Sequence, residues 1–242
     1  MRLTGLTPSI EHKNRSLAVD VLRGCSLILM IIFHFGYDLT VFGYTHYDTN
    51  SDIEWRVFRA VIVSGFLLAV GMSSYLAYGE RIDKRKLTKN ITKLFAVSAL
   101  ISVGSYAMYP NNWVYFGVIH FVTVALPLSL VFIHRPKLAL ILAIIIIVGY
   151  FGDFLTLERP WLWSVQHLGI PTHTVDLVSF LPWFAVVLIG ILLIHHQLLP
   201  NIRANKVSLL LARMGQYSLL IYLLHQPLLF ICFYSIQSLS VF

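Results

Sequence analysis

The sequence predicts an all-α polytopic membrane protein, a helix bundle with about seven transmembrane helices, that forms a single domain over residues 1–242. Three observations predict this class. Hydrophobic residues make up 57% of the chain and charged residues only 12%, which is too little polar surface for a soluble domain. The apolar residues fall into runs long enough to cross a bilayer. The basic residues gather at alternate ends of those runs.

The apolar runs give the expected helices in order. Each needs about 20 mostly apolar residues to span the hydrocarbon core. The first run carries charge, is too long and lacks a small-residue cleavage site, so we do not expect it to be a cleavable signal peptide. The expected spans cover residues 17–41, 56–78, 91–108, 113–133, 138–154, 177–195 and 217–239.

The Lys and Arg residues predict the orientation. Fourteen of the 18 Lys and Arg residues, the basic set, lie at one group of span ends. The opposite span ends hold Arg159, with Arg56 and Arg59 at a helix edge, while Arg23 lies inside the first span. The excess of positive charge marks the cytoplasmic side, so we expect a cytoplasmic N-terminus and a C-terminus outside. The basic set comprises Arg2, Lys13, Arg15, Arg81, Lys84, Arg85, Lys86, Lys89, Lys93, Arg135, Lys137, Arg203, Lys206 and Arg213.

Two connecting segments have distinctive compositions. The cytoplasmic stretch GERIDKRKLTKN, residues 79–90, contains Lys84, Arg85 and Lys86. Its charges set the topology, and they are also suited to lipid head groups or to a phosphate-rich ligand. The long outer segment 153–176 contains Trp161 and Trp163, which fits a stretch lying on the membrane surface. Its length also fits a lid.

The first span carries four ionisable residues, Asp20, Arg23, His34 and Asp38. At about 100° per residue they fall within about 60° of one another, on a face that must meet protein or water. Asp20 and Arg23 are spaced to pair near the cytoplasmic end. His34 and Asp38 are spaced to hydrogen-bond on the outer half, either as an interhelical polar contact or as a general base with its orienting carboxylate.

Further polar residues lie within other spans. His120 falls in the fourth, Trp183 near the outer end of the sixth, and His225 and Gln226 in the seventh, beside a kinking Pro227. Each is compatible with a packing role, but together they are candidates for lining one hydrated pocket with Asp20. Cys25 and Cys232 form no disulfide or metal motif, and the histidine spacing predicts no metal site.

Four segments, in order, carry a family resemblance: VDVLRGCSLILMIIFHFGYDLTVFGYTH, GVIHF, LPWFAVVLIG and LARMGQYSLLIYLLHQPLL. Together they resemble the heparan-α-glucosaminide N-acetyltransferase-like family of membrane proteins, from Arg15 to about Phe230. V-D-x-x-R-G followed by L-M and His34 is the most specific part. The ending G-x-x-S-L-x-I-Y-x-x-H-x-P is shared with a broader group of membrane acyltransferases.

The resemblance implies an activity. Family members take acetyl from cytoplasmic acetyl-CoA and transfer it to an amino sugar across the membrane. A catalytic Asn of the animal enzyme falls on His34, a departure from the family pattern, and a catalytic His falls within one residue of His46. We therefore expect His34, Asp38 and His46 to be catalytic, and Arg23, Lys84, Arg85 and Lys86 to hold CoA phosphates.

The expected function is an acyl-CoA-dependent O- or N-acyltransferase. Its expected partners are acyl-CoA, a sugar or glycan-like acceptor and the lipid bilayer, with a homodimer left open and no nucleic acid or metal. We expect an integral protein of the bacterial cytoplasmic (inner) membrane. The alternatives are a transporter or proton relay, which also uses buried His and Asp residues but often carries internal repeats that this chain lacks, and a sensor without turnover.

Overall fold

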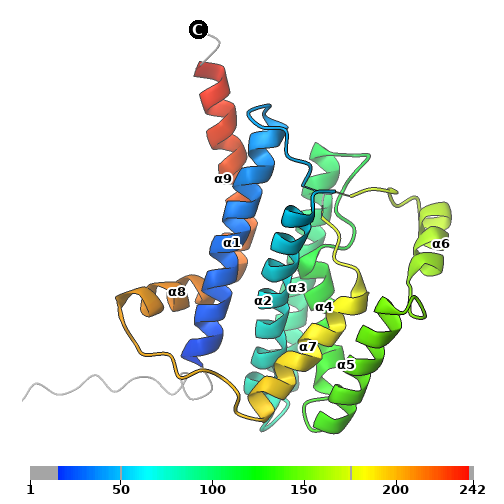
Figure 1. Cartoon of the computed structure of the whole chain (residues 1–242), viewed down its shortest axis with the longest axis vertical. Helices are drawn as coiled ribbons and strands as arrows, with labels where there is room; N and C mark the ends of the chain where they lie inside the picture. The colour runs from blue at the N-terminus through cyan, green and yellow to red at the C-terminus, as the bar shows by residue number, and fades with distance from the viewer. Residues whose placement is uncertain (1–15, 50, 175, 240–242) are drawn as a thin grey trace, which may run out of the picture.

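The computed structural model describes residues 16–49, 51–174 and 176–239, and it is all-α, as predicted (Figure 1). Within these ranges there are nine helices. Four are long and apolar enough to cross a membrane, namely α1, α2, α3 and α9, and the shorter α4, α5 and α7 are apolar as well. The helices are α1 (Leu17–Val41), α2 (Ile53–Tyr78), α3 (Lys84–Met108), α4 (Val118–Leu130), α5 (Pro136–Phe151), α6 (Glu158–Leu168), α7 (Phe180–His195), α8 (Lys206–Gln216) and α9 (Ser218–Leu239).

Each predicted span corresponds to one of the seven apolar helices, with differences at the ends. The first matches α1 exactly. Helix α3 begins at Lys84, well before the expected start, because the Asp83 side chain accepts a hydrogen bond from the Lys86 amide at 3.1 Å and caps the helix. Helix α4 is shorter than expected, since Gly117 is its N-cap and the residues before it form an irregular segment.

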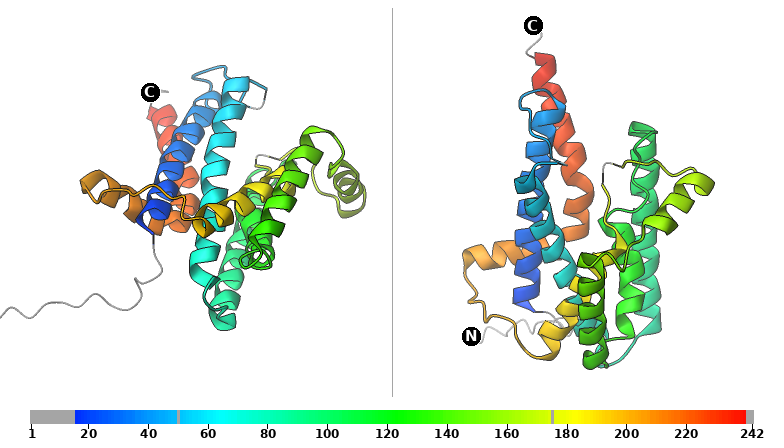
Figure 2. Two further views of the ribbon diagram at one scale, coloured as in Figure 1. Left: turned by 60° about the horizontal axis from the view of Figure 1, so that its bottom comes forward. Right: turned by 45° about the vertical axis from the view of Figure 1, so that its right-hand side comes forward.

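Helix α2 joins two groups of helices. Its N-terminal half packs with α1 in a buried cluster around Leu27, Met30, Phe33 and Ile62, which α8 and α9 flank. Here and below, inner and outer refer to the predicted sides of the membrane. The rest of α2 contributes to the largest core, together with α4, α5 and α7. Helix α3 packs on α4, and α9 packs on α1 and α8. Figure 2 shows the two groups from the side, with α1, α8 and α9 in one and α3, α4 and α5 in the other.

Helix α8 was not predicted as a helix, and it lies across α1 (Figures 1 and 2). The crossing is close because glycines face backbone on both sides. A Cβ on Gly24 would lie 2.1 Å from the Leu211 carbonyl oxygen, and one on Gly215 would lie 2.0 Å from that of Asp20. Small residues let helix backbones approach in this way. The opposite face of α8 exposes Leu209 and Leu210, as expected of a helix lying at a membrane surface.

The outer segment folds back over the helix ends. Trp161 on α6 donates its indole N–H to the Tyr115 hydroxyl at 3.0 Å, and Thr174 donates to the Trp113 carbonyl at 2.8 Å. The Val178 amide donates to the Phe116 carbonyl at 3.1 Å. The segment 169–179 is therefore fastened to the segment 113–117, which places both beside the candidate site.

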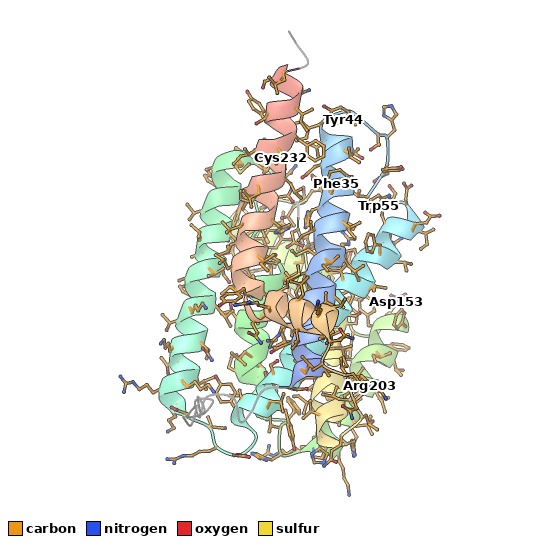
Figure 3. The ribbon with its side chains drawn as sticks, turned by 90° about the vertical axis from the view of Figure 1, so that its left-hand side faces the viewer. Phe35, Tyr44, Trp55, Asp153, Arg203 and Cys232 are labelled. Carbon is orange, nitrogen blue, oxygen red and sulfur yellow. The ribbon has the colours of Figure 1, made fainter. Side chains whose placement is uncertain are left out.

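The connections sort to two ends of the bundle. Those between α2 and α3, between α4 and α5, and after α7 lie at the lower end in Figure 1, and these contain the basic stretches. Arg203 lies toward that end in Figure 3, while Tyr44 and Trp55 lie toward the other. The sidedness of the membrane stays a prediction, and Arg2, Lys13 and Arg15 of the basic set lie outside the described residues.

Candidate active site

The inner half of α1 forms the expected ion pair. An Arg23 guanidinium nitrogen lies 3.3 Å from Asp20 Oδ1, and the same side chain donates to Ser73 on α2. Gln216, the last residue of α8, donates to Asp20 Oδ2 at 3.3 Å. The pair therefore connects α1 to α2 and α8, and both carboxylate oxygens of the buried Asp20 are hydrogen-bonded.

The outer half of α1 meets α9 through polar side chains. The rings of His34 and His225 lie edge to face, with centroids 4.8 Å apart and an angle of 60° between their planes. Gln226 donates its amide N–H to Asp38 Oδ1 at 2.8 Å, and the Asp38 side chain is fully buried. We call His34, Asp38, His225 and Gln226 the polar cluster. Figure 3 labels Phe35, which directly follows His34 on α1.

The predicted hydrogen bond between His34 and Asp38 does not form. Asp38 Oδ1 accepts from Gln226 instead, and His34 Nδ1 has no partner. The i, i+4 spacing permits the bond but does not require it. The carboxylate is engaged by the amide that α9 presents, a contact that depends on how the two helices pack.

The polar cluster is incompletely hydrogen-bonded. Four of its buried side-chain atoms have no hydrogen-bond partner among the residues that the structure describes: His34 Nδ1, Asp38 Oδ2, His225 Nε2 and Gln226 Oε1. Leaving a buried polar atom unpaired costs about 1–3 kcal/mol, and native structures rarely contain such atoms without a reason. Four of them lie within one four-residue cluster, which makes this cluster the candidate site for a polar ligand.

Further polar residues lie near the cluster, on α9 and in the connecting segments. The Tyr222 hydroxyl donates to Asp176 Oδ2 over a long 3.5 Å, and a Cβ on Gly117 would lie 2.5 Å from the same oxygen. Burial raises the pKa of Asp176, although the Val118 amide, Arg59 and Tyr222 counteract this rise. Burial also raises the pKa of Tyr109, just beyond α3, and the nearby Asp38 carboxylate adds to that rise.

Sequence reasoning did not select Asp176 or Tyr109. Both lie in connecting segments of ordinary composition, and no local pattern distinguishes them from other loop residues. They come near the cluster only because the segments 109–117 and 169–179 fold over the ends of the helices. No pattern in the sequence identifies these two residues, because only the tertiary structure brings them near the cluster.

Several predicted site residues lie apart from the cluster. His120 Nδ1 accepts from the Gly117 amide at 3.3 Å and closes the first turn of α4, while its Nε2 contacts Ser102 Oγ of α3 at 2.9 Å, so both nitrogens are occupied. Trp183 packs against the large core. His46 is exposed in the connection between α1 and α2. The structure therefore brings His34, Asp38, His225 and Gln226 together, but not these three.

The predicted phosphate-binding residues lie at the opposite end of the bundle. Lys84, Arg85 and Lys86 occupy the exposed first turn of α3, and Lys84 and Arg85 line an open hollow of about 560 Å³ together with Arg81. Lys86 Nζ lies 5.9 Å from the centre of the Tyr78 ring. Arg23 is engaged with Asp20 and Ser73, which gives it a packing role.

The chain belongs to the family described as heparan-alpha-glucosaminide N-acetyltransferase, catalytic, whose model matches residues 15–227. This confirms the resemblance drawn from the sequence motifs. The matched range includes every residue of the polar cluster and runs from the start of α1 into α9. Neither the curated proteins nor the solved structures give a significant match to this chain.

Proposed function

We propose that this protein is an integral-membrane acyltransferase that moves an acetyl group from cytoplasmic acyl-CoA to an amine or hydroxyl of a sugar-like acceptor at or beyond the membrane. The observation that carries the proposal is the polar cluster with its four unpartnered buried atoms, inside the region that matches the acetyltransferase family. A membrane protein keeps such a costly cluster where a ligand completes it.

The unpartnered oxygens favour an acceptor that brings hydrogen-bond donors. Because Gln226 turns its N–H toward Asp38 Oδ1, its carbonyl oxygen is the atom left without a partner. Asp38 Oδ2 is likewise an acceptor when the carboxylate is ionised. An amine or a sugar hydroxyl supplies the N–H or O–H that these oxygens lack, whereas a thioester carbonyl does not.

The acyl donor binds from the basic end of the bundle in this proposal. Lys84, Arg85 and Lys86 are exposed, and Lys84 and Arg85 line an open hollow with Arg81 and Asp83, which suits the phosphates of CoA. We assign them the phosphates in preference to Arg23, whose guanidinium already contacts Asp20 and Ser73. The thioester must then reach His34, which lies about 21 Å from Asp20 along α1 by the helix rise.

His34 contacts the reacting groups in either of two routes. In direct transfer, the acceptor attacks the thioester carbonyl while a base removes its proton. In the two-step route, a histidine nitrogen takes the acetyl group first and passes it on. Both routes need an imidazole in the apolar space between α1 and α9, which is where His34 and His225 lie.

The test uses the purified protein in lipid nanodiscs with radiolabelled acetyl-CoA and a panel of amino sugars and neutral sugars. We expect transfer to at least one acceptor. His34→Ala should fold and bind acetyl-CoA but transfer acetyl roughly 10²-fold more slowly or worse. His195→Ala is the matched control, because His195 contacts Tyr75 at the far end of α7. Absence of acetyl-CoA binding and of transfer would refute the proposal.

The orientation that brings CoA to the basic end is tested separately. After Cys25 and Cys232 are replaced by serine, Lys84→Cys should react with an impermeant maleimide only from the cytoplasm. Ser51→Cys, in the connection before α2, should react only from outside. Labelling of both positions from one side would contradict the orientation.

A further inference from the structure

One hydrogen bond distinguishes the two histidines of the polar cluster. His225 Nδ1 lies 2.7 Å from the backbone carbonyl oxygen of Tyr222. A carbonyl oxygen only accepts hydrogen bonds, so Nδ1 must carry the proton. In a neutral imidazole the other nitrogen, Nε2, then has a free lone pair. The fold therefore sets the tautomer of His225.

The lone pair on His225 Nε2 is buried and unpartnered within the cluster. The centroid of the His225 ring lies 4.8 Å from that of the His34 ring, and His225 is only 9% exposed. His34 makes no hydrogen bond that selects one of its tautomers. Of the two imidazoles, only His225 is held in advance in the form that accepts a proton at a known atom.

We propose that His225 is the general base of the acyl transfer, with Nε2 taking the proton of the acceptor, and that the Tyr222 carbonyl holds it in the required tautomer. This rests on the proposed function. The acceptor N–H or O–H bond breaks as its heteroatom bonds to the thioester carbon. The proton moves to Nε2, and the C–S bond then breaks. The imidazolium returns the proton to sulfur, which releases CoA as the free thiol.

His34 takes a complementary role in this scheme. With no bond fixing its tautomer, it can offer an N–H to the thioester oxygen, where negative charge develops during attack. Asp38 is fixed by the hydrogen bond that its Oδ1 accepts from Gln226. The roles expected from the sequence, with His34 as the base and Asp38 as its partner, are thereby redistributed over both helices.

The groups that bear on a titration of His225 come from several elements. His34 and Asp38 face it from α1, with Asp38 acting through the adjacent Gln226. Tyr222 lies on its own helix and connects to Asp176 of the segment 169–179. Tyr109 lies near Asp38, and Arg59 acts on Asp176 from α2.

The experiment compares the pH dependence of the acyl-transfer rate in wild type, His225→Gln and His34→Gln, in nanodiscs with saturating acetyl-CoA. We expect His225→Gln to lose roughly 10²-fold in rate and to lose the acidic limb of the wild-type pH profile. His34→Gln should also be slow but should keep that limb. Thermal melting and acetyl-CoA binding establish that each variant is folded. If His225→Gln does not fold, His225→Asn is measured in its place.

A second measurement reads the tautomer directly. In nitrogen-15 NMR of histidine-labelled protein, the signal absent from the His225 variant should show a proton on Nδ1 and none on Nε2. A proton on Nε2, or an acidic limb that survives in His225→Gln and disappears in His34→Gln, would overturn the inference. Wild type that transfers no acetyl to any acceptor would instead overturn the proposed function, and the NMR result would still decide the tautomer.

Discussion

Helix α1 carries two polar sites on one face, and they differ in how completely their hydrogen bonds are made. At the inner end, Asp20 has both carboxylate oxygens occupied by Arg23 and Gln216. At the outer end, Asp38 has one oxygen bonded to Gln226 and the other without a partner. Similar residues in one helix thus form one complete contact and one incomplete one.

The difference separates structural from functional polar groups in a membrane. A buried polar group stabilises helix packing when its partners are all supplied by the protein. A group left unpaired lowers stability, and a ligand that completes it recovers that free energy. We therefore interpret the Asp20 site as a packing contact that connects α1, α2 and α8, and the polar cluster as a binding and reaction site.

The largest expected effect is on stability at the inner site. Asp20→Ala leaves Arg23 without its carboxylate and should lower the free energy of unfolding by about 3 kcal/mol, the lower end for breaking a buried pair. Unfolding in SDS or by heat measures it. Asp20→Asn, which keeps an oxygen for Gln216, should lose less. A large loss of turnover per folded molecule with unchanged stability would place Asp20 in the chemistry instead.

The opposite result is expected at the outer site. Replacing Asp38 and Gln226 together by leucine removes two unpartnered oxygens and should raise the free energy of unfolding by about 1 kcal/mol. Acetyl transfer should be lost in the same protein. The same unfolding assay measures this, with each single substitution as a control. A double variant less stable than wild type would show that the polar cluster also stabilises the packing of α1 against α9.

A smaller effect is expected for the basic end of the bundle. Neutralising Lys84, Arg85 and Lys86 with glutamine should weaken acetyl-CoA binding by roughly fivefold at low salt, because exposed charges each contribute little. The salt dependence of binding should flatten. Titration calorimetry at two ionic strengths measures both, and Lys206→Gln is the matched control. Unchanged affinity would mean that these charges only set the topology.

The smallest effect concerns Asp176 beside the outer site. Burial raises its pKa, so ionising it in the folded state costs free energy. Its contribution to stability is therefore fully present below the unfolded value, about pH 4, and is lost as the pH rises through the raised folded value. Asp176→Asn should remove this part of the pH dependence of the melting temperature. Parallel pH curves for variant and wild type would contradict it.

The sequence by itself determined the helices and the composition of the site. Apolarity and run length are local properties, so the spans could be assigned without the fold, and the stripe of Asp20, Arg23, His34 and Asp38 follows from helix periodicity alone. The motifs around them identified the family over residues 15–227. The Asp20–Arg23 pair was also predictable, because both partners lie one turn apart on one helix.

Only the tertiary structure decided which polar groups meet across helices. Asp38 was expected to orient His34 and instead binds Gln226, while His120 is occupied by Ser102 and Gly117 and lies outside the cluster. Such partners are distant in sequence, and their pairing depends on how α9 rotates and slides against α1. Helix α8 also escaped prediction, because its fit against α1 rests on glycines in two segments far apart in the chain. Periodicity orders residues on one helix, but only packing selects the face that each helix presents to its neighbour.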